Sequence, residues 1–289
     1  MIPFRELSSP FRRYSRLFAM ITAYLDESYN GATFCVGGWV MYETHWPRLE
    51  RDWRQWIDRE RQRSVKAGSK PISRYHASDC SNLQGEYSSE NGWGISRQHK
   101  FAKRLLGIII KHKPQGVVIG GSVDLFKKHF PEDSERWRRA MYYYSIALVM
   151  NEINEIRKAH YPCEKITIFY DRGKLSSMAD VAFRSLKEDA SQETEDVAYH
   201  FVAMTSLGWE DTVLLQPADL IAYEGMKRMD GHLKGKSAIR KSFAALLDKR
   251  VDIGVSAFTD AYFTELKKAK LRFIEEAEID AKKRRTHYL

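Results

Sequence analysis

The stretch Met20-Ile-Thr-Ala-Tyr-Leu-Asp-Glu-Ser28 is an apolar run followed by two acids, Asp26 and Glu27, and it opens the predicted sheet. From Ile21 onward its pattern indicates a β-strand. A second stretch rich in Val, Phe and Trp covers residues 32–42, after a turn at Asn30-Gly31. Asn-Gly between two apolar strands is the typical sequence of a tight β-hairpin. The folded part of the chain is therefore expected to begin with a pair of antiparallel strands.

Helices and further strands alternate after this hairpin. Apolar residues spaced three and four apart predict a helix from Trp46 to about Arg63, whose tryptophans favour core packing and whose arginine-rich face offers a phosphate-binding alternative. The remaining patterns predict helices over about 97–112, 134–160 and 178–187, strands over 116–120, 165–171 and 198–204, and a late helix that opens at Gln216. Strands first paired as a hairpin and later alternating with helices favour an α/β fold, a mixed sheet flanked by helices.

The chain shows no internal repeat and no linker, so one elaborated domain over residues 20–289 is expected. Within it we expect a helical insertion at about 43–114 and a helical C-terminal region at about 231–289. A basic extension precedes the domain over residues 1–19, and Met20 is an alternative natural start. The basic run Lys282-Lys-Arg-Arg285 is either a solvated end or an arm for nucleic acid.

The charge balance favours a partner that carries phosphates. Lys and Arg number 47 against 38 Asp and Glu, a formal net charge of +9. A basic excess is typical of nucleic-acid-binding proteins, although it also serves solubility, and a membrane surface is the other acidic partner. No apolar stretch is long enough to span a bilayer, so no membrane insertion is expected.

The cysteines exclude two kinds of site. Only three occur, Cys35, Cys80 and Cys163, without the CxxC spacing of a cysteine-rich zinc site and too few for a disulfide framework. Cys35 lies in an apolar run and is expected to be a small buried residue. A reducing compartment, and hence a cytoplasmic location, fits this usage best.

Three aspartates stand where a site is expected. Asp26 and Asp171 each close an apolar strand, and residues at strand ends can converge on one edge of a sheet. Asp219 lies at the start of an apolar helix, after Gln216 near the cap and Pro217. Each also has a structural explanation: Asp26 as a turn residue, Asp171 as a capping or turn residue, and Asp219 as a first-turn acid stabilised by the helix dipole.

If these three carboxylates meet, their repulsion requires a cation. Mg²⁺ or Mn²⁺ suits such hard oxygen ligands, and a pair of these ions can activate water for the hydrolysis of a phosphodiester. The sequence therefore predicts a metal site built from Asp26, Asp171 and Asp219 and a hydrolase that acts on nucleic acid.

Four motifs carry a family resemblance. They are Tyr24-Leu-Asp-Glu-Ser28, Tyr75-His-Ala-Ser-Asp79, Phe169-Tyr-Asp-Arg-Gly173 and Leu215-Gln-Pro-Ala-Asp-Leu-Ile-Ala-Tyr223. In this order, over about residues 20–229, they resemble the domain-of-unknown-function family numbered 3800. The resemblance implies a ribonuclease-H-like fold, a metal-binding acidic cluster and nuclease chemistry, with some members associated with mobile elements or phage defence.

Carried over by position, Asp26 matches the first-strand aspartate of that family, Asp171 the central-strand aspartate and Asp219 the aspartate of the late helix. A fourth acid is left open. The ribonuclease H pattern takes it from the helix before the strand of Asp171, which offers Glu152 and Glu155, and both also suit a solvated helix face. The other candidates are Glu27 and Asp79, and His76 is a candidate proton shuttle because imidazole titrates near neutral pH.

Three functions compete at this point. The first is a metal-dependent nuclease acting on RNA, DNA or a hybrid, with Asp26, Asp171 and Asp219 as ligands. The second is a non-catalytic nucleic-acid-binding protein, and the third is an integrase-like nucleotidyl transferase. A homodimer is compatible with the sequence, which does not decide the oligomeric state.

Overall fold

Six strands form one mixed sheet in the computed structural model of the protein, which describes residues 20–131, 134–173, 176–188 and 197–268. Across the sheet the order is β5-β4-β1-β2-β3-β6. The strands are β1 (Met20–Tyr29), β2 (Thr33–Tyr42), β3 (Gln115–Ser122), β4 (Lys165–Asp171), β5 (Phe201–Leu207) and β6 (Ile253–Ala257).

The first three strands pair as an antiparallel meander, which confirms the predicted hairpin. β1 pairs with β2 and β2 pairs with β3 in antiparallel register, whereas β4 is parallel to β1, β5 to β4 and β6 to β3. The β1–β2 turn is closed by the Asn30 side chain, whose Oδ1 accepts hydrogen bonds from the backbone N–H groups of Ala32 and Thr33 at 3.1 and 2.8 Å. Gly31 takes a φ of +88°, a backbone conformation that favours glycine.

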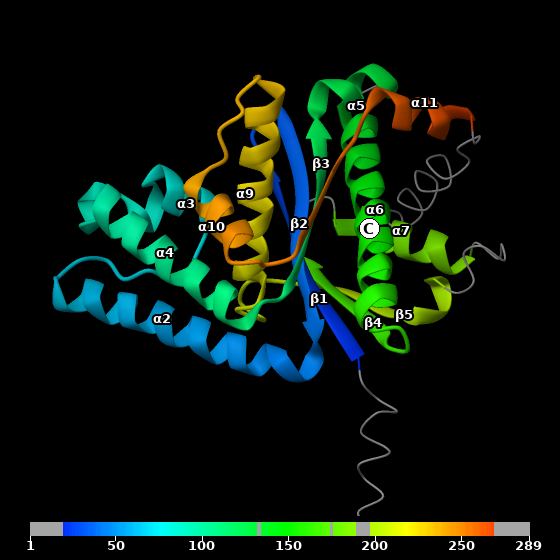
Figure 1. Cartoon of the computed structure of the whole chain (residues 1–289). Coiled ribbons are helices and arrows are strands. Elements are labelled where there is room, and N and C mark those ends of the chain that lie inside the picture. The colour runs from blue at the N-terminus through cyan, green and yellow to red at the C-terminus, as the bar shows by residue number, and fades with distance from the viewer. Residues whose placement is uncertain (1–19, 132–133, 174–175, 189–196, 269–289) are drawn as a thin grey trace, which may run out of the picture.

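Helices cover both faces of the sheet (Figure 1). One face carries α2 (Trp46–Lys66), α3 (Ala77–Asn82), α4 (Ile95–His112), α9 (Leu215–Leu233) and α10 (Lys241–Asp248). The other carries α5 (Val123–His129), α6 (Ser134–His160), α7 (Ser176–Glu188) and α11 (Asp260–Lys268). Short 3-10 turns lie at Glu43–His45, Gly85–Tyr87 and Ser89–Asn91.

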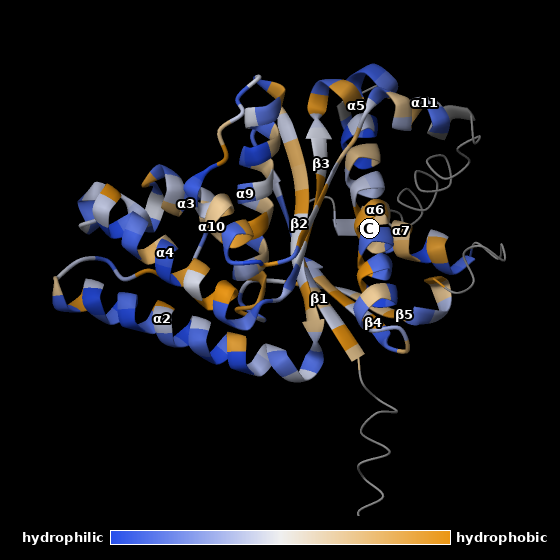
Figure 2. Ribbon diagram, viewed as in Figure 1, coloured by the Kyte–Doolittle hydropathy of each residue, from blue (hydrophilic) through white to orange (hydrophobic). Residues whose placement is uncertain are grey.

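Each face buries its own hydrophobic core. On the α6 side, Ile21 and Leu25 of β1 pack with apolar residues of α6 and α7. On the α9 side, the core includes Trp46 and Trp53 of α2, which are 3% and 0% exposed. The prediction that these tryptophans are core residues is therefore confirmed, while the outer surface of α2 is largely hydrophilic (Figure 2).

Two glycines let α9 lie directly on the sheet. A Cβ at Gly37 of β2 would meet the Cα of Ala222 at 2.8 Å, closer than side-chain carbons approach a backbone atom. One helical turn later, a Cβ at Gly225 would meet a methyl group of Val118 on β3 at 2.5 Å. Because both positions lack a side chain, the helix axis comes close enough for its first turns to reach the strand β1.

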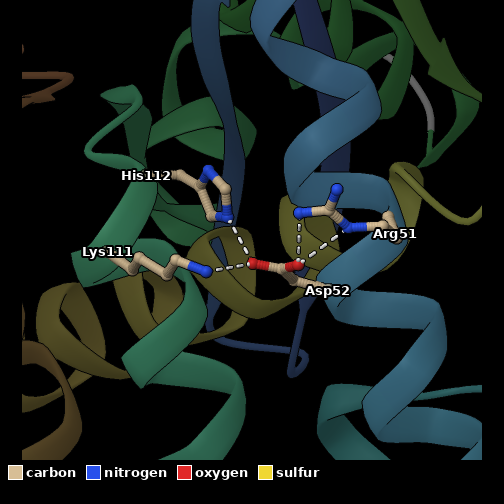
Figure 3. Close-up of polar contacts among 4 residues, drawn as sticks. All are labelled: Arg51, Asp52, Lys111 and His112. Atoms are coloured by element: carbon tan, nitrogen blue, oxygen red, sulfur yellow. Dashed lines mark hydrogen bonds and ion pairs between the residues drawn. The ribbon is translucent and has the colours of Figure 1, made fainter.

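A polar cluster joins α2 to α4 at the edge of the insertion (Figure 3). Asp52 Oδ2 accepts hydrogen bonds from Lys111 Nζ at 2.6 Å and contacts His112 Nε2 at 2.9 Å, while its Oδ1 accepts from Arg51. The hydrogen bond from Lys111 is the largest cause of a pKa of Asp52 well below its usual range, followed by that from His112. This cluster fixes the C-terminal end of α4 against α2.

The expected C-terminal helical region needs a correction, because residues 253–257 form the strand β6 beside β3. This strand is short and half-exposed at the sheet edge, so its sequence lacks a continuous apolar run. The short helices α3 and α5 also lay outside the predicted elements. The basic extension over residues 1–19 and the run at 282–285 lie outside the described residues. None of the described helices is both long and apolar enough to cross a membrane.

Candidate active site

Asp26 and Asp171 lie side by side on neighbouring parallel strands. Leu25 of β1 pairs with Tyr170 of β4, so the next residue on each strand is an aspartate. Tyr24 and Phe169, two residues earlier, stack with ring centroids 5.3 Å apart on the α9 face. Because side chains alternate between faces, Asp26 and Asp171 emerge on that same face. The sequence suggested that Asp26 ends its strand. This prediction is wrong, because β1 continues to Tyr29.

Asp219 reaches the same place from α9. The helix begins at Leu215, so Asp219 lies just beyond the first turn rather than within it, and the helix dipole alone explains its position less well. Its side chain is buried, and Oδ2 accepts a hydrogen bond of 2.7 Å from the backbone N–H of Ala77. Gly37 pairs directly with Asp26 across the two strands and packs against the backbone of Ala222 on α9. This close packing sets the separation between α9, which carries Asp219, and the strand that carries Asp26.

Glu27 approaches the site from the α6 side of β1. Its Oε2 accepts a hydrogen bond of 3.1 Å from the Tyr142 hydroxyl, which is buried on α6. Its backbone N–H donates to Asp26 Oδ1 at 2.7 Å, so the two acids are coupled through the main chain as well as by charge. Of the four candidates for the fourth acid, Glu27 is the one that stands beside the three aspartates.

One cavity of about 230 Å³ joins these groups. Its wall consists of Asp26, Glu27, Arg74, Tyr75, His76, Asp171, Trp209, Leu215, Gln216 and Asp219. The structure therefore brings together all three predicted aspartates, together with Glu27 and His76.

Burial and mutual repulsion disfavour charge on these acids. Burial, and then the charges of Asp219, Glu27 and Asp171, raise the pKa of Asp26 well above its ordinary value. Burial and then Asp171 raise the pKa of Glu27 to about 7, against the lowering effect of Tyr142. For Asp219, burial raises the pKa to about 6 although His76, the Ala77 N–H and Arg74 lower it.

The pKa of Asp171 is also raised by burial, and Arg74 is the strongest opposing influence. Four carboxyl groups in one pocket with raised pKa values are a combination expected of functional sites, because burial of neighbouring acids otherwise destabilises the fold.

The chemistry of these groups fits a hard divalent cation, since every acidic donor is a carboxylate oxygen. Among the residues that the structure describes, however, no three His, Cys, Asp or Glu side chains are drawn together tightly enough to hold a metal ion as they stand. Each of three acids instead faces a hydrogen-bond donor: Asp26 the Glu27 N–H, Glu27 the Tyr142 hydroxyl and Asp219 the Ala77 N–H. Like charges that repel one another are expected to turn toward such donors.

The other fourth-acid candidates are not among the residues that line the cavity. Asp79 pairs with His76, its Oδ2 lying 2.9 Å from Nδ1. Glu152 accepts a hydrogen bond from Ser256 of β6, and Glu155 pairs with Lys158 on the surface of α6. These two glutamates sit in the half of α6 beyond Tyr142, so the helix offers the site a tyrosine rather than an acid.

Six residues of the site were not assigned to it by sequence reasoning. Five of them line the cavity, namely Arg74, Tyr75, Trp209, Leu215 and Gln216, and the sixth, Tyr142, donates a hydrogen bond to Glu27. Gln216 joins α9 to the insertion, because its Oε1 accepts hydrogen bonds from Trp53 Nε1 at 3.1 Å and from the Tyr75 N–H at 2.9 Å. The adjacency of Arg74 to the Tyr75-His76 motif was a usable signal, whereas Trp209 and Tyr142 have no local sequence pattern that marks them.

No family model, no curated protein and no solved structure matches this chain.

Proposed function

We propose that this protein is a divalent-metal-dependent nuclease with a ribonuclease-H-like fold. The observation that carries the proposal is the meeting of Asp26, Asp171, Asp219 and Glu27 in one cavity, from positions distant along the chain. A mixed sheet that begins with a hairpin and places acids on β1, β4 and a late helix supports the fold assignment, together with the four motifs described above.

Asp26, Asp171 and Asp219 are the proposed ligands of Mg²⁺ or Mn²⁺, and Glu27 is the fourth acid. When bound, such ions offset the acidic charge, lower the pKa of water and stabilise the leaving oxygen of a phosphodiester. The protein contributes the orientation of these carboxylates, through the neighbouring strands and through the Ala77 and Tyr142 donors. His76 lines the cavity and is the proposed proton shuttle.

The basic residues of the chain support a nucleic acid as the substrate, either RNA, DNA or a hybrid. Arg74 of the insertion lines the acidic cavity, and its guanidinium can pair with a phosphate.

The decisive experiment measures cleavage of labelled single-stranded and duplex RNA and DNA with Mg²⁺, with Mn²⁺ and with a chelator. The wild type should cut only with metal, and Asp26→Asn should abolish cutting while its circular dichroism spectrum is unchanged. Asp248→Asn is the matched control, because Asp248 is exposed at the end of α10 and outside the cavity wall. Full activity of Asp26→Asn, or metal-independent cutting, would contradict the proposal.

One observation favours a second candidate, a non-catalytic nucleic-acid-binding protein. In the part of the chain that the structure describes, the acids are not grouped as tightly as metal ligands. This candidate predicts a salt-dependent gel shift that neither metal nor Asp26→Asn alters, and no cut product at any metal concentration.

A further inference from the structure

An exposed tryptophan stands on the wall of the acidic cavity. Trp209 is 42% exposed and lines the cavity together with the four acids. The guanidinium carbon of Arg74 lies 4.7 Å from the centre of its ring, so a planar cation covers a planar aromatic group. We call these two side chains the Arg74–Trp209 platform. A single exposed aromatic residue is common on protein surfaces, so its exposure alone carries no meaning.

The setting of Trp209 distinguishes it from such residues, because it lies in a turn that is closed by hydrogen bonds. The N–H of Gly208 donates to Asp211 Oδ2 at 2.7 Å, and the N–H of Asp211 donates back to the Gly208 carbonyl at 3.0 Å. Arg172, which directly follows Asp171, donates from Nη2 to the same Asp211 oxygen at 3.0 Å. The turn that carries Trp209 is thus bonded to the loop that carries one of the acids.

The two members of the platform come from separate parts of the chain. Trp209 follows the strand β5, whereas Arg74 belongs to the insertion and is held there by its neighbour Tyr75, whose N–H donates to Gln216. Both members are planar, and both aromatic rings and guanidinium groups stack on nucleobases. Arg74 also places a positive charge beside Asp171 and Asp219, where a phosphate linked to a stacked base would enter.

We propose that the Arg74–Trp209 platform stacks an unpaired nucleobase next to the phosphate that enters the acidic cavity. The inference rests on the proposed function and narrows its substrate class. A base that packs on a side chain cannot remain stacked in a regular duplex, so the preferred substrate is a single strand, an unpaired end or a flipped nucleotide.

The test compares a fluorescent twelve-nucleotide single strand with versions in which one base at a time is removed to leave an abasic site. Binding is measured by fluorescence anisotropy with Ca²⁺ in place of Mg²⁺, and cleavage is measured separately with Mn²⁺. Trp209→Ala should bind the intact strand roughly 5- to 150-fold more weakly than the wild type, the usual range for loss of one base–aromatic stack. Trp209→Phe should lose less binding affinity than Trp209→Ala, because phenylalanine keeps an aromatic ring on which the base can stack.

The decisive comparison is with the abasic strands. At one position, removal of the base should weaken binding by the wild type but not by Trp209→Ala, because the stack is already absent in the variant. Arg74→Lys, which keeps the charge but not the planar group, should fall between the wild type and Trp209→Ala. Tyr199→Ala removes an exposed aromatic residue outside the cavity wall and should bind like the wild type.

The two proposals fail in different ways. Equal binding of the intact strand by the wild type and Trp209→Ala would overturn the stacking inference, and so would an equal response of both proteins to every abasic site. Metal-dependent cutting in either of these cases would leave the nuclease proposal standing. Base-dependent binding without cutting would contradict the nuclease and leave the platform intact, and failure of the wild type to bind any strand would overturn the platform.

Discussion

At the scale of single residues, the acids of the cavity oppose the stability of the fold in the absence of a cation. Asp26 shows this most clearly, because burial and three neighbouring acids all disfavour its charged form. A neutral amide of the same shape removes that repulsion. The residue that matters most for the proposed activity is therefore one whose replacement should make the metal-free protein more stable.

We accordingly expect Asp26→Asn to increase the free energy of unfolding of the metal-free protein by about 1–3 kcal/mol. Urea denaturation in the presence of a chelator measures this change. In Mg²⁺ or Mn²⁺ the difference should shrink or reverse, because only the wild type gains binding energy from the ion. Destabilisation of the metal-free protein by Asp26→Asn would argue against repulsion at this position.

The same acids make the free energy of unfolding of the metal-free protein depend on pH. The pKa of Asp219 is raised to about 6 and that of Glu27 to about 7, from ordinary values of 3.8 and 4.5. The folded protein therefore holds protons that the unfolded chain has released, so the stability from these groups is complete below about pH 4 and is lost as pH rises through 6 and 7.

Denaturation of the metal-free protein at intervals from pH 4.5 to 8 should show a free energy of unfolding that falls by on the order of 1 kcal/mol per pH unit for each such group, until the pH passes the raised pKa of that group. Glu27→Gln should remove the share of Glu27 from the slope between about pH 4.5 and 7, so that the profile flattens between pH 6 and 7 and keeps only the share of Asp219 below pH 6. A wild-type profile that is flat or rises over this interval would contradict the raised pKa values.

At the scale of elements, the distance between α9 and the sheet governs the site. Gly37 opposes Asp26 on the strand pair β1–β2 and touches the helix backbone at Ala222, one turn beyond Asp219. A methyl group at this position would push the helix outward, because a backbone contact at 2.8 Å has no flexible end that can move aside.

Gly37→Ala is therefore expected to lower the free energy of unfolding by about 1–3 kcal/mol and to reduce metal-dependent cutting even where the variant is fully folded. Gly107→Ala on α4 is the matched control, because a Cβ there meets nothing within 4 Å and alanine favours a helix by about 1 kcal/mol. Unchanged activity of folded Gly37→Ala would show that the helix position does not control the acids.

Within the insertion, hydrogen bonds and ion pairs of Asp52 hold α2 and α4 together. Replacement by asparagine should cost about 1 kcal/mol of unfolding free energy, because one oxygen loses its charge-assisted partners on α4. Asp58→Asn, which breaks only an exposed pair with Arg61 on the same helix, should cost less than about 0.5 kcal/mol. Urea denaturation at low and high salt measures the unfolding free energy of both variants. An equal loss in Asp52→Asn and Asp58→Asn would contradict the conclusion that Asp52 holds α2 and α4 together.

At the scale of the whole molecule, the sequence predicted the architecture and part of the site. Runs with a clear period, such as the helix Ser134–His160 and the strand Lys165–Asp171, were predicted with the bounds that the structure has. The strand β6 was missed because five half-exposed edge residues have no distinctive pattern, and β5 begins at Phe201, three residues later than expected.

The site could be predicted only where acids follow apolar strands. Asp26 and Asp171 stand out by this pattern, and parallel pairing makes them neighbours. Trp209 and Tyr142 could not be found, because their place at the cavity depends on which elements cross in space. Glu27 and Asp79 could not be separated from sequence for the same reason, since the place of Asp79 relative to the cavity follows from the path of the insertion.

The Gln216 side chain has a further thermodynamic consequence. One amide oxygen accepts donors from Trp53 on α2 and from the backbone of Tyr75, so detaching the insertion would leave both donors buried or newly hydrated at once. We therefore expect that the insertion does not unfold independently of the rest of the domain. In a calorimeter the described body of the protein should absorb heat in one cooperative peak, and the residues that line the cavity should unfold together with the sheet.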